Sequence, residues 1–334
     1  MMRKMLFYLT ILLLACGKTD APAQSPFFAK GADIGWLSEM EAAGIRFSNT
    51  AGKEDDCLNI LKGLGMNTIR LRVWVNPKDG WCGMQDVVNQ AVRAQKIGMK
   101  LMIDFHYSDW WADPGKQNKP AAWVNYDIPQ LLEAIKSHTR EVMLALKQNG
   151  VEPTWVQVGN ETNDGMLWET GRASKDMKTF AAMINAGYDA IKEVSAASKV
   201  IVHISNGYDN NMFRWMFDGL KANNAKFDVI GMSLYPDPAR WQEINDQVIY
   251  NMKDMISRYG KEVMMCEIGM PVDQAEACNR CIKDLISRMR SLPDQKGTGV
   301  LYWEPECHNN WKGYKMGAFD NSGKPTMALE AFRD

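Results

Sequence analysis

Eight short apolar runs recur along the chain, and longer amphipathic stretches separate them. The runs are rich in β-branched residues and lie near residues 28–34, 68–75, 100–106, 154–159, 199–204, 228–234, 262–267 and 299–304. Between them, stretches such as residues 130–150 place apolar side chains at helical spacing. Alternating strand and helix patterns predict parallel strands joined by right-handed crossovers.

The number of strand–helix units predicts a closed barrel. Eight of them in a chain of 334 residues are typical of a (β/α)8 TIM barrel of the α/β class, here as a single domain over residues 28–334. An open doubly wound sheet is the alternative. Neither GxGxxG after the first run nor GxxxxGK[ST] occurs in the sequence, so a nucleotide-binding fold has no support.

The N-terminal residues have the composition of an export signal. Basic residues Arg3 and Lys4 precede an apolar run from Leu6 to Ala15 that is too short to span a bilayer. The run ends in LLLAC, which resembles a bacterial lipobox with Cys16 as the lipidated residue; an ordinary signal peptide is the alternative. We expect a lipoprotein signal peptide over residues 1–15, a polar tether over residues 16–27, and export to a membrane-anchored position at the outer membrane or cell surface.

The net charge limits the class of binding partner, and the cysteine spacing limits the possible disulfides and metal sites. The net charge is −1 with acids and bases interspersed, which does not indicate a nucleic-acid partner. Six further cysteines permit disulfides in an exported protein, with 15 possible pairings. Cys278 and Cys281 form a CxxC within a helical pattern and lack a second ligand pair, so we expect no metal site. We expect a monomer without a cofactor.

Polar and aromatic side chains gather where the predicted strands end. In a barrel these ends meet at one mouth, where catalytic groups lie. Glu161 ends the fourth strand and Glu267 ends the seventh, on opposite sides of that mouth. The strand-end residues are Asp33, Arg72, His106, Asn160, Glu161, His203, Tyr235, Glu267 and Trp303.

Two facing carboxylates suit glycoside hydrolysis, in which one protonates the leaving oxygen and the other attacks the anomeric carbon or activates water. Each residue also has a structural alternative. A lone strand-end glutamate is usually a solvated rim residue or half of an ion pair, and a lone histidine is usually structural. Arg70 and Arg72 can be buried charges paired with Asp104, with Glu304 as a further partner. These alternatives would have to coincide at eight strand ends.

The chain resembles the arabinogalactan endo-β-1,4-galactanases of glycoside hydrolase family 53 over about residues 30–334. The resemblance rests on GADI (31–34), GMNTIRLRVWVNP (65–77), GMKLMIDFHYSDWWADPGKQNKPAAW (98–123), VQVGNETNDGMLW (156–168) and YWEPE (302–306). It implies endo-acting, retaining cleavage of β-1,4-galactan. A long calcium-binding insertion found in some relatives is missing here, so calcium is not carried over.

The resemblance also implies residue roles. Glu161 is the expected acid/base and Glu267 the expected nucleophile, with Tyr235 and Arg72 keeping Glu267 ionised. The remaining positions are expected to bind or orient the sugars: Asp33, His106, Asp109, Asp113, Asn160, Trp168, His203 and Trp303. A β-mannanase, xylanase or cellulase of the same clan is the first alternative, and a non-catalytic glycan-binding lipoprotein is the second.

Overall fold

The computed structural model describes residues 27–333. The predicted signal peptide, the lipidation residue Cys16 and the tether up to residue 26 therefore lie outside the described residues. Within the described part, no helix is both long and apolar enough to cross a membrane.

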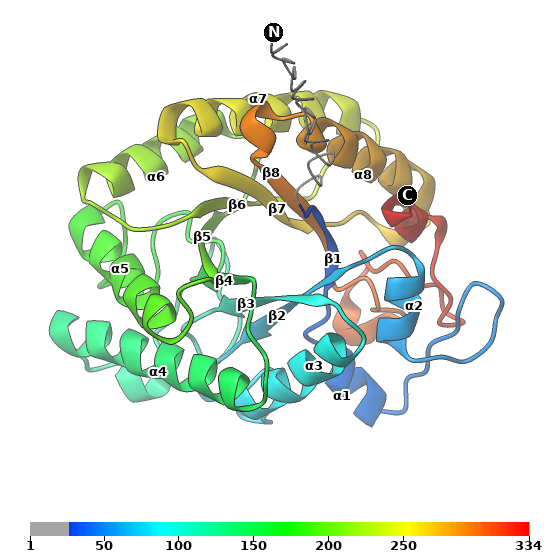
Figure 1. Ribbon diagram of the computed structural model, residues 1–334, viewed down its shortest axis with the longest axis horizontal. Coiled ribbons are helices and arrows are strands. Elements are labelled where there is room, and N and C mark those ends of the chain that lie inside the picture. The colour runs from blue at the N-terminus through cyan, green and yellow to red at the C-terminus, as the bar shows by residue number, and fades with distance from the viewer. Residues whose placement is uncertain (1–26, 334) are drawn as a thin grey trace, which may run out of the picture.

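Eight parallel strands close into a barrel in the order β1 to β8, which confirms the predicted (β/α)8 fold. Figure 1 views the barrel nearly end-on, with the helices around its outside. The strands are β1 (Ala29–Asp33), β2 (Thr68–Val73), β3 (Lys100–Phe105), β4 (Trp155–Val158), β5 (Lys199–Ile204), β6 (Val229–Leu234), β7 (Glu262–Ile268) and β8 (Gly297–Trp303).

The helices follow the predicted amphipathic stretches. They are α1 (Leu37–Ala42), α2 (Cys57–Gly63), α3 (Met84–Lys96), α4 (Ile128–Gln148), α5 (Met177–Val194), α6 (Asn210–Ala222), α7 (Trp241–Tyr259) and α8 (Ala275–Arg290). Local signals set their ends. A capping box of Asp127 and Gln130 begins α4, because the two side chains satisfy backbone groups that the first turn leaves free. Gly260, at φ 68°, ends α7.

The last helical stretch of the described chain, Met327–Phe332, is a 3-10 helix. The segment still packs against α8, where the Nδ2 of Asn279 donates to the carbonyl of Met327 at 2.7 Å. The chain is thereby tied to the barrel close to its C-terminus.

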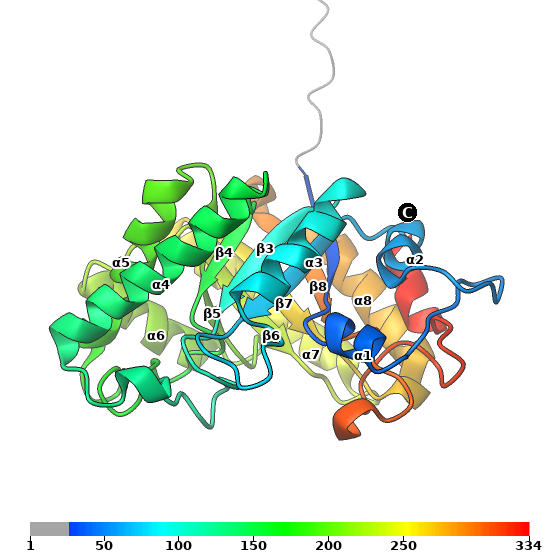
Figure 2. The same ribbon diagram turned by 90° about the horizontal axis from the view of Figure 1, so that it is seen from below.

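Two apolar regions hold the barrel together. One lies between the strands and the surrounding helices. The other fills the end of the barrel interior where the strands begin, and consists of Ala29, Met102, Trp155, Ile201, Val229, Met264, Cys266 and Leu301. In Figure 2 the dark blue start of β1 lies at this end of the barrel, at the top of the view. The interior toward the opposite end is polar, so the charged groups described next sit above a closed apolar floor.

Candidate active site

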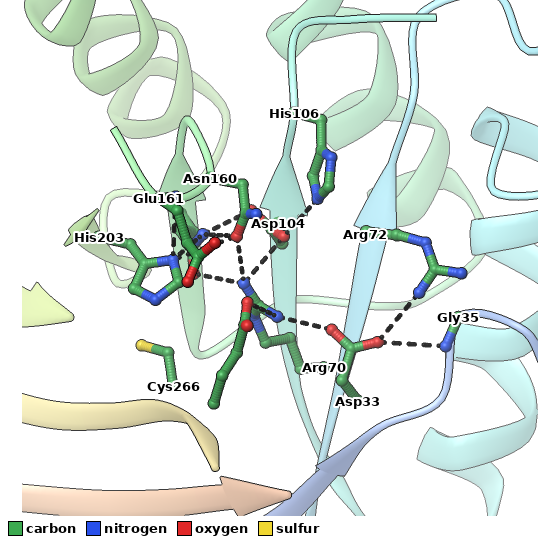
Figure 3. A network of polar contacts seen from close by, with 12 residues as sticks. Asp33, Gly35, Arg70, Arg72, Asp104, His106, Asn160, Glu161, His203 and Cys266 are labelled. Carbon is green, nitrogen blue, oxygen red and sulfur yellow. Dashed lines mark hydrogen bonds and ion pairs between the residues drawn. The ribbon is translucent and has the colours of Figure 1, made fainter. Parts of the chain in front are cut away.

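Arg70, on β2, is the centre of the polar network in the barrel mouth (Figure 3). Its side chain is 1% exposed. Nη1 lies 2.7 Å from Asp33 Oδ2 and 2.8 Å from Glu267 Oε1, and Nη2 lies 2.9 Å from Asp104 Oδ2. Nη2 also donates to Asn160 Oδ1 at 2.9 Å. One guanidinium thus connects side chains from β1, β2, β3, β7 and the turn after β4.

The predicted contact between Arg72 and Glu267 is wrong. The recorded ionic partners of Arg72 are Glu304 and Asp33; Arg70 holds Glu267 instead. Alternate residues of a strand face the same side, but they lie about 6–7 Å apart along it. Arg72 is therefore one step nearer the rim, where it meets the end of β8. The predicted pairing of a strand arginine with Glu304 is confirmed.

Glu267 is held by two groups. Besides Arg70, the phenol of Tyr235 donates to Glu267 Oε2 at 3.0 Å, as predicted. Burial and the charge of Glu267 raise the pKa of Tyr235 well above its usual value, so the phenol keeps its proton. A register shift between Met232 and Ser233 places Ser233 opposite Glu267. The carboxylate is therefore fixed in an ion pair with one face toward the mouth.

Glu161 lies in a different environment. Gly159 turns the chain at φ 80°, and Glu161 itself has φ 44°, a conformation that is costly for a residue with a side chain. Burial, and then the charge of Glu267, raise the pKa of Glu161 to about 8. Glu161 therefore favours its protonated form, as an acid must, whereas Glu267 lies in an ion pair with Arg70.

The two strand-end histidines orient other side chains. His203 is fully buried; Nδ1 accepts from Gln157 Nε2 at 2.9 Å, so Nε2 carries the proton toward Ser233 Oγ at 2.7 Å. Burial and then Arg70 hold its pKa well below the usual value. Ser233 in turn hydrogen-bonds Glu161. His203 thus orients Ser233 and, through it, Glu161.

His106 is also engaged by protein groups. Nδ1 accepts from the backbone N–H of Ala112 at 3.1 Å and from Trp74 Nε1 at 3.3 Å. Nε2 therefore carries the proton and lies 3.0 Å from Asp104 Oδ2. Burial alone would raise the pKa of Asp104, but Arg70 and His106 lower it. His106 thus links the third-strand loop to the charged network.

The loop residues predicted to bind the substrate differ in the contacts that they make. The carboxylate of Asp109 accepts hydrogen bonds from the backbone N–H groups of Asn76 and Ala121 and so joins the loop after β2 to the loop after β3. Trp168 donates to the carbonyl of Asp164 and has one face covered by Arg172, 3.7 Å from its ring centroid. Asp113 contributes to the raised pKa of Glu161. Trp303, the last residue of β8, is partly exposed.

All six cysteines in the described residues are free and buried, so the disulfides that the count permitted are not formed. One group of potential metal ligands occurs in the described chain: side-chain atoms of Glu304, Glu306 and Cys307 lie within 4.8 Å of one another. Both oxygens of Glu304 are already used, by Arg72 and by the backbone N–H of Trp36. A cation there would compete with Arg72.

Sequence reasoning missed four residues of this network as site residues: Arg70, Asp104, Gln157 and Ser233. Each lies on the interior face of a strand. Polar residues at alternate positions, as in the IRLRV of β2, are the sequence signal, because alternate residues face the same side. Such residues are costly inside a barrel unless they pair with one another.

A (β/α)8 barrel with these two glutamates at the ends of β4 and β7 is the architecture of a glycoside hydrolase. The chain belongs to glycosyl hydrolase family 53, whose model matches residues 29–332. It is therefore a glycoside hydrolase, with the matched region spanning the whole barrel.

Individual relatives of known or probable activity agree with this family assignment. The chain is 32% identical over 334 residues to a probable arabinogalactan endo-β-1,4-galactanase A of Neosartorya fischeri, covering 93% of this chain and 92% of that protein. It is 30% identical to the endo-β-1,4-galactanase of Bacillus subtilis, covering 83% and 70%. Among solved structures, a fungal β-1,4-galactanase superposes with a TM-score of 0.85 at 29% identity, covering 92% and 99%.

Proposed function

We propose that this protein is an endo-acting, retaining hydrolase of β-1,4-galactosidic bonds in galactan and type I arabinogalactan. The family and the galactanases named above support the substrate. The observation that carries the chemistry is the contrast between the two glutamates. Glu161 has its pKa raised to about 8 by burial and by Glu267, whereas Glu267 is ion-paired with Arg70 at 2.8 Å.

In the first step Glu267 attacks the anomeric carbon while the bond to the leaving oxygen breaks. Glu161 gives its proton to that oxygen, so the released chain carries a new hydroxyl. In the second step Glu161 takes a proton from water, and the water oxygen displaces Glu267 from the sugar. Two inversions at the same carbon give net retention.

The network around Arg70 supports this cycle. Arg70 and the Tyr235 phenol hold the carboxylate of Glu267 in position before attack. When Glu267 becomes an ester its negative charge is lost, and the Coulomb interaction that raised the pKa of Glu161 is lost with it. The pKa of Glu161 then falls, so Glu161 is more readily ionised and can accept a proton from water in the second step, because the pKa of one glutamate depends on the charge of the other.

Product analysis tests the proposal. Unbranched β-1,4-galactan is incubated with the enzyme beside mannan, xylan and cellulose, with Glu267→Gln as the matched inactive control. We expect a spread of galactooligosaccharides from galactan first, with the β anomer seen by proton NMR before mutarotation. Release of galactose alone, initial α anomer, or faster cleavage of another polysaccharide contradicts it.

We also propose that the mature protein is a lipid-anchored protein of the outer membrane or cell surface. The proposal is supported by the LLLAC sequence that ends at Cys16 and by the polar residues that follow it. Cys16→Ala should move the protein out of the membrane fraction or block its processing. A barrel beginning near Ser25 should keep full activity in the same assay, and a soluble wild-type protein contradicts the anchor.

A further inference from the structure

Basic side chains gather at the end of the barrel opposite the catalytic groups. Because all strands are parallel and each helix runs back along the outside, the starts of the strands and the last turns of the helices lie at one end. Figure 2 shows the start of β1 and the last turns of α3 and α4 there. We call this end the basic face. Six of its lysines form no ion pair within the described residues: Lys62, Lys96, Lys100, Lys147, Lys221 and Lys261.

The charge of these lysines is not balanced by nearby carboxylates. Five of the six are exposed, and Lys261 is partly exposed. Carboxylates at the same end are paired with other cations: Asp228 lies 2.9 Å from Lys192, and Glu262 lies 2.5 Å from Lys199. The basic face therefore has an excess of positive charge, although the net charge of the whole chain is −1.

Helix stability explains only part of this charge. A cation in the last turn of a helix is favoured by the helix dipole, and Lys62 lies in such a turn. Lys100 begins β3 and Lys261 directly precedes β7, so neither belongs to a helix. Their ammonium groups lie over the rings of Phe27 and Phe227, 5.6 Å and 5.2 Å from the ring centroids. These two lysines need another explanation.

The predicted tether joins the barrel at the same face. Phe27, the first described residue, is 46% exposed and packs on Trp155 at the start of β4, with 6.1 Å between the ring centroids. Cys16, the proposed site of lipidation, precedes Phe27 by so few residues that the chain between them spans at most about 40 Å. A lipid on Cys16 therefore keeps the basic face close to the bilayer.

The mouth end of the barrel carries the opposite charge. The helices begin there, and aspartates cap three of them: Asp127 at α4, Asp176 at α5 and Asp209 at α6. A negatively charged surface therefore attracts the basic face and repels the mouth. The exposed ring of Phe27 beside Lys100 also suits a bilayer surface, because the ring enters the headgroup region while the ammonium group meets the phosphates.

We propose that the basic face docks on a bilayer surface of anionic phospholipid and holds the barrel with its mouth turned away from the membrane. The inference rests on the proposed lipid anchor, and it does not depend on which polysaccharide is cleaved. An anionic polysaccharide would offer the lysines the same negative charge, but the tether that ends at Phe27 brings a lipid surface to this face. The docked barrel leaves its mouth open to polymers.

Lysine acetylation of the mature lipidated protein tests the docking. The protein is reconstituted into vesicles of phosphatidylcholine alone, or of phosphatidylcholine mixed with phosphatidylglycerol, and the acetylation rate of each lysine is measured by mass spectrometry. On the anionic vesicles we expect Lys100 and Lys261 to react roughly fivefold more slowly than on the neutral ones. Lys178, exposed in the first turn of α5 at the mouth end, is the internal control and should react equally on both.

A matched pair of charge-reversal variants tests the role of the lysines. Lys96→Glu combined with Lys100→Glu should abolish the protection of Lys261 on anionic vesicles. Lys178→Glu combined with Lys283→Glu changes the net charge equally at exposed positions away from the basic face, and should preserve the protection. Melting temperatures of both variants show whether the fold is intact, and the comparison of vesicles with the wild-type protein does not depend on either variant.

Each outcome supports or overturns the docking. Equal rates for Lys100 and Lys261 on both kinds of vesicle overturn it, and so does an equal slowing of Lys178. Persistent protection of Lys261 in a folded Lys96→Glu, Lys100→Glu variant overturns the role of charge. Protection by soluble polygalacturonate, with none by anionic vesicles, shows a polysaccharide site instead and also overturns the docking.

Failure of the lipid anchor is seen separately. A protein that does not float with phosphatidylcholine vesicles lacks the anchor. The acetylation rates are then compared after the protein is added to preformed vesicles at low salt. Protection of Lys100 and Lys261 by the anionic vesicles alone still supports the docking, and unchanged rates overturn it.

Discussion

Arg70 and Arg72 are two residues apart on the same strand and equally buried at 1% exposure. They share Asp33 as an ion-pair partner but otherwise differ in their surroundings. Arg70 is bordered by carboxylates and amides, among them Asp33, Asp104 and Glu267. Arg72 pairs closely with Glu304 and more distantly with Asp33, and indole rings lie around its guanidinium, of which that of Trp111 is nearest. Arg70 therefore holds a group of charged side chains in place, whereas Arg72 packs mainly against aromatic rings.

The difference separates two tasks within one barrel mouth. The Arg70 cluster surrounds the reacting groups: Arg70 is ion-paired with Glu267, and its charge also acts on Glu161, whose pKa it lowers against the larger effects of burial and of Glu267. The Arg72 cluster shapes the surface beside them, since a guanidinium packed between indoles fixes ring positions. Variants of the two arginines should therefore affect different kinetic parameters even where they destabilise the fold alike.

The largest effect is expected for Arg70→Met. This change leaves several buried carboxylates without their cation, which should lower the free energy of unfolding by about 3–5 kcal/mol. Because Glu267 also loses its ion-pair partner, kcat on galactan should fall by roughly 10³-fold. Urea unfolding and kcat at substrate saturation give the two values. A variant that is destabilised but retains near-normal kcat contradicts the assigned role of Arg70.

The second prediction is that activity falls at high pH because Glu161 loses its proton. Glu161 must carry a proton to act, and its pKa is raised to about 8 by burial and by Glu267. Above that pH the acid is lost, so kcat/KM should fall about tenfold for each further pH unit. Glu161→Gln should abolish this basic limb and retain cleavage of aryl galactosides with activated leaving groups better than cleavage of galactan.

Two results would contradict that assignment. A basic limb that persists unchanged in Glu161→Gln places the titrating acid elsewhere. An equal loss of activity on galactan and on the activated aryl substrate shows that Glu161 does more than protonate the leaving group. Wild-type enzyme assayed over the same pH range with both substrates is the control.

A smaller effect is expected for Arg72→Met. The variant leaves Glu304 buried without its partner and frees Trp36 and Trp111 to move. The free energy of unfolding should again fall by about 3–5 kcal/mol, but kcat/KM on long galactan should fall only roughly tenfold, chiefly through KM. A loss confined to kcat, as in Arg70→Met, would erase the functional distinction between the two arginines.

The sequence predicted the barrel well because period and residue type act locally. Every predicted strand appears within a few residues of its expected bounds, and Glu161, Tyr235 and Glu267 were identifiable because each lies at or just beyond a strand end. The sequence did not reveal which arginine reaches Glu267. That depends on how far each side chain lies along β2 and on the register shift between β6 and β7, both of which arise only when the barrel closes.

The sequence also did not reveal that the strand-end histidines are buried. His203 occupies a strand-end position that suits sugar contact, but its ring nitrogens are used by Gln157 and Ser233. Both partners come from other strands, so no spacing within the sequence relates them. Role assignments at strand ends are therefore reliable for residues that must act as carboxylates, and weaker for residues whose function depends on neighbours across the barrel.

The smallest effect is expected for the removal of metal ions, and the residues concerned lie next to Arg72. Next to Glu304 lies the carboxyl group of Glu306, which is fully buried. Burial, and then the charge of Glu304, raise the pKa of Glu306 well above its usual value. A carboxyl that keeps its proton is neutral and needs no cation, so Arg72 alone balances Glu304.

Activity and melting temperature should therefore stay unchanged after dialysis against a strong chelator, and elemental analysis should find no stoichiometric metal. Glu306→Gln, which preserves shape and neutrality, should alter the free energy of unfolding by no more than about 0.5–1 kcal/mol. Chelation that lowers the melting temperature, reversed by zinc or calcium and absent in Glu306→Gln, would show that a cation binds Glu304, Glu306 and Cys307. The charge balance beneath the tryptophans would then depend on a metal as well as on Arg72, and the contrast between the two arginines would need to be redrawn around it.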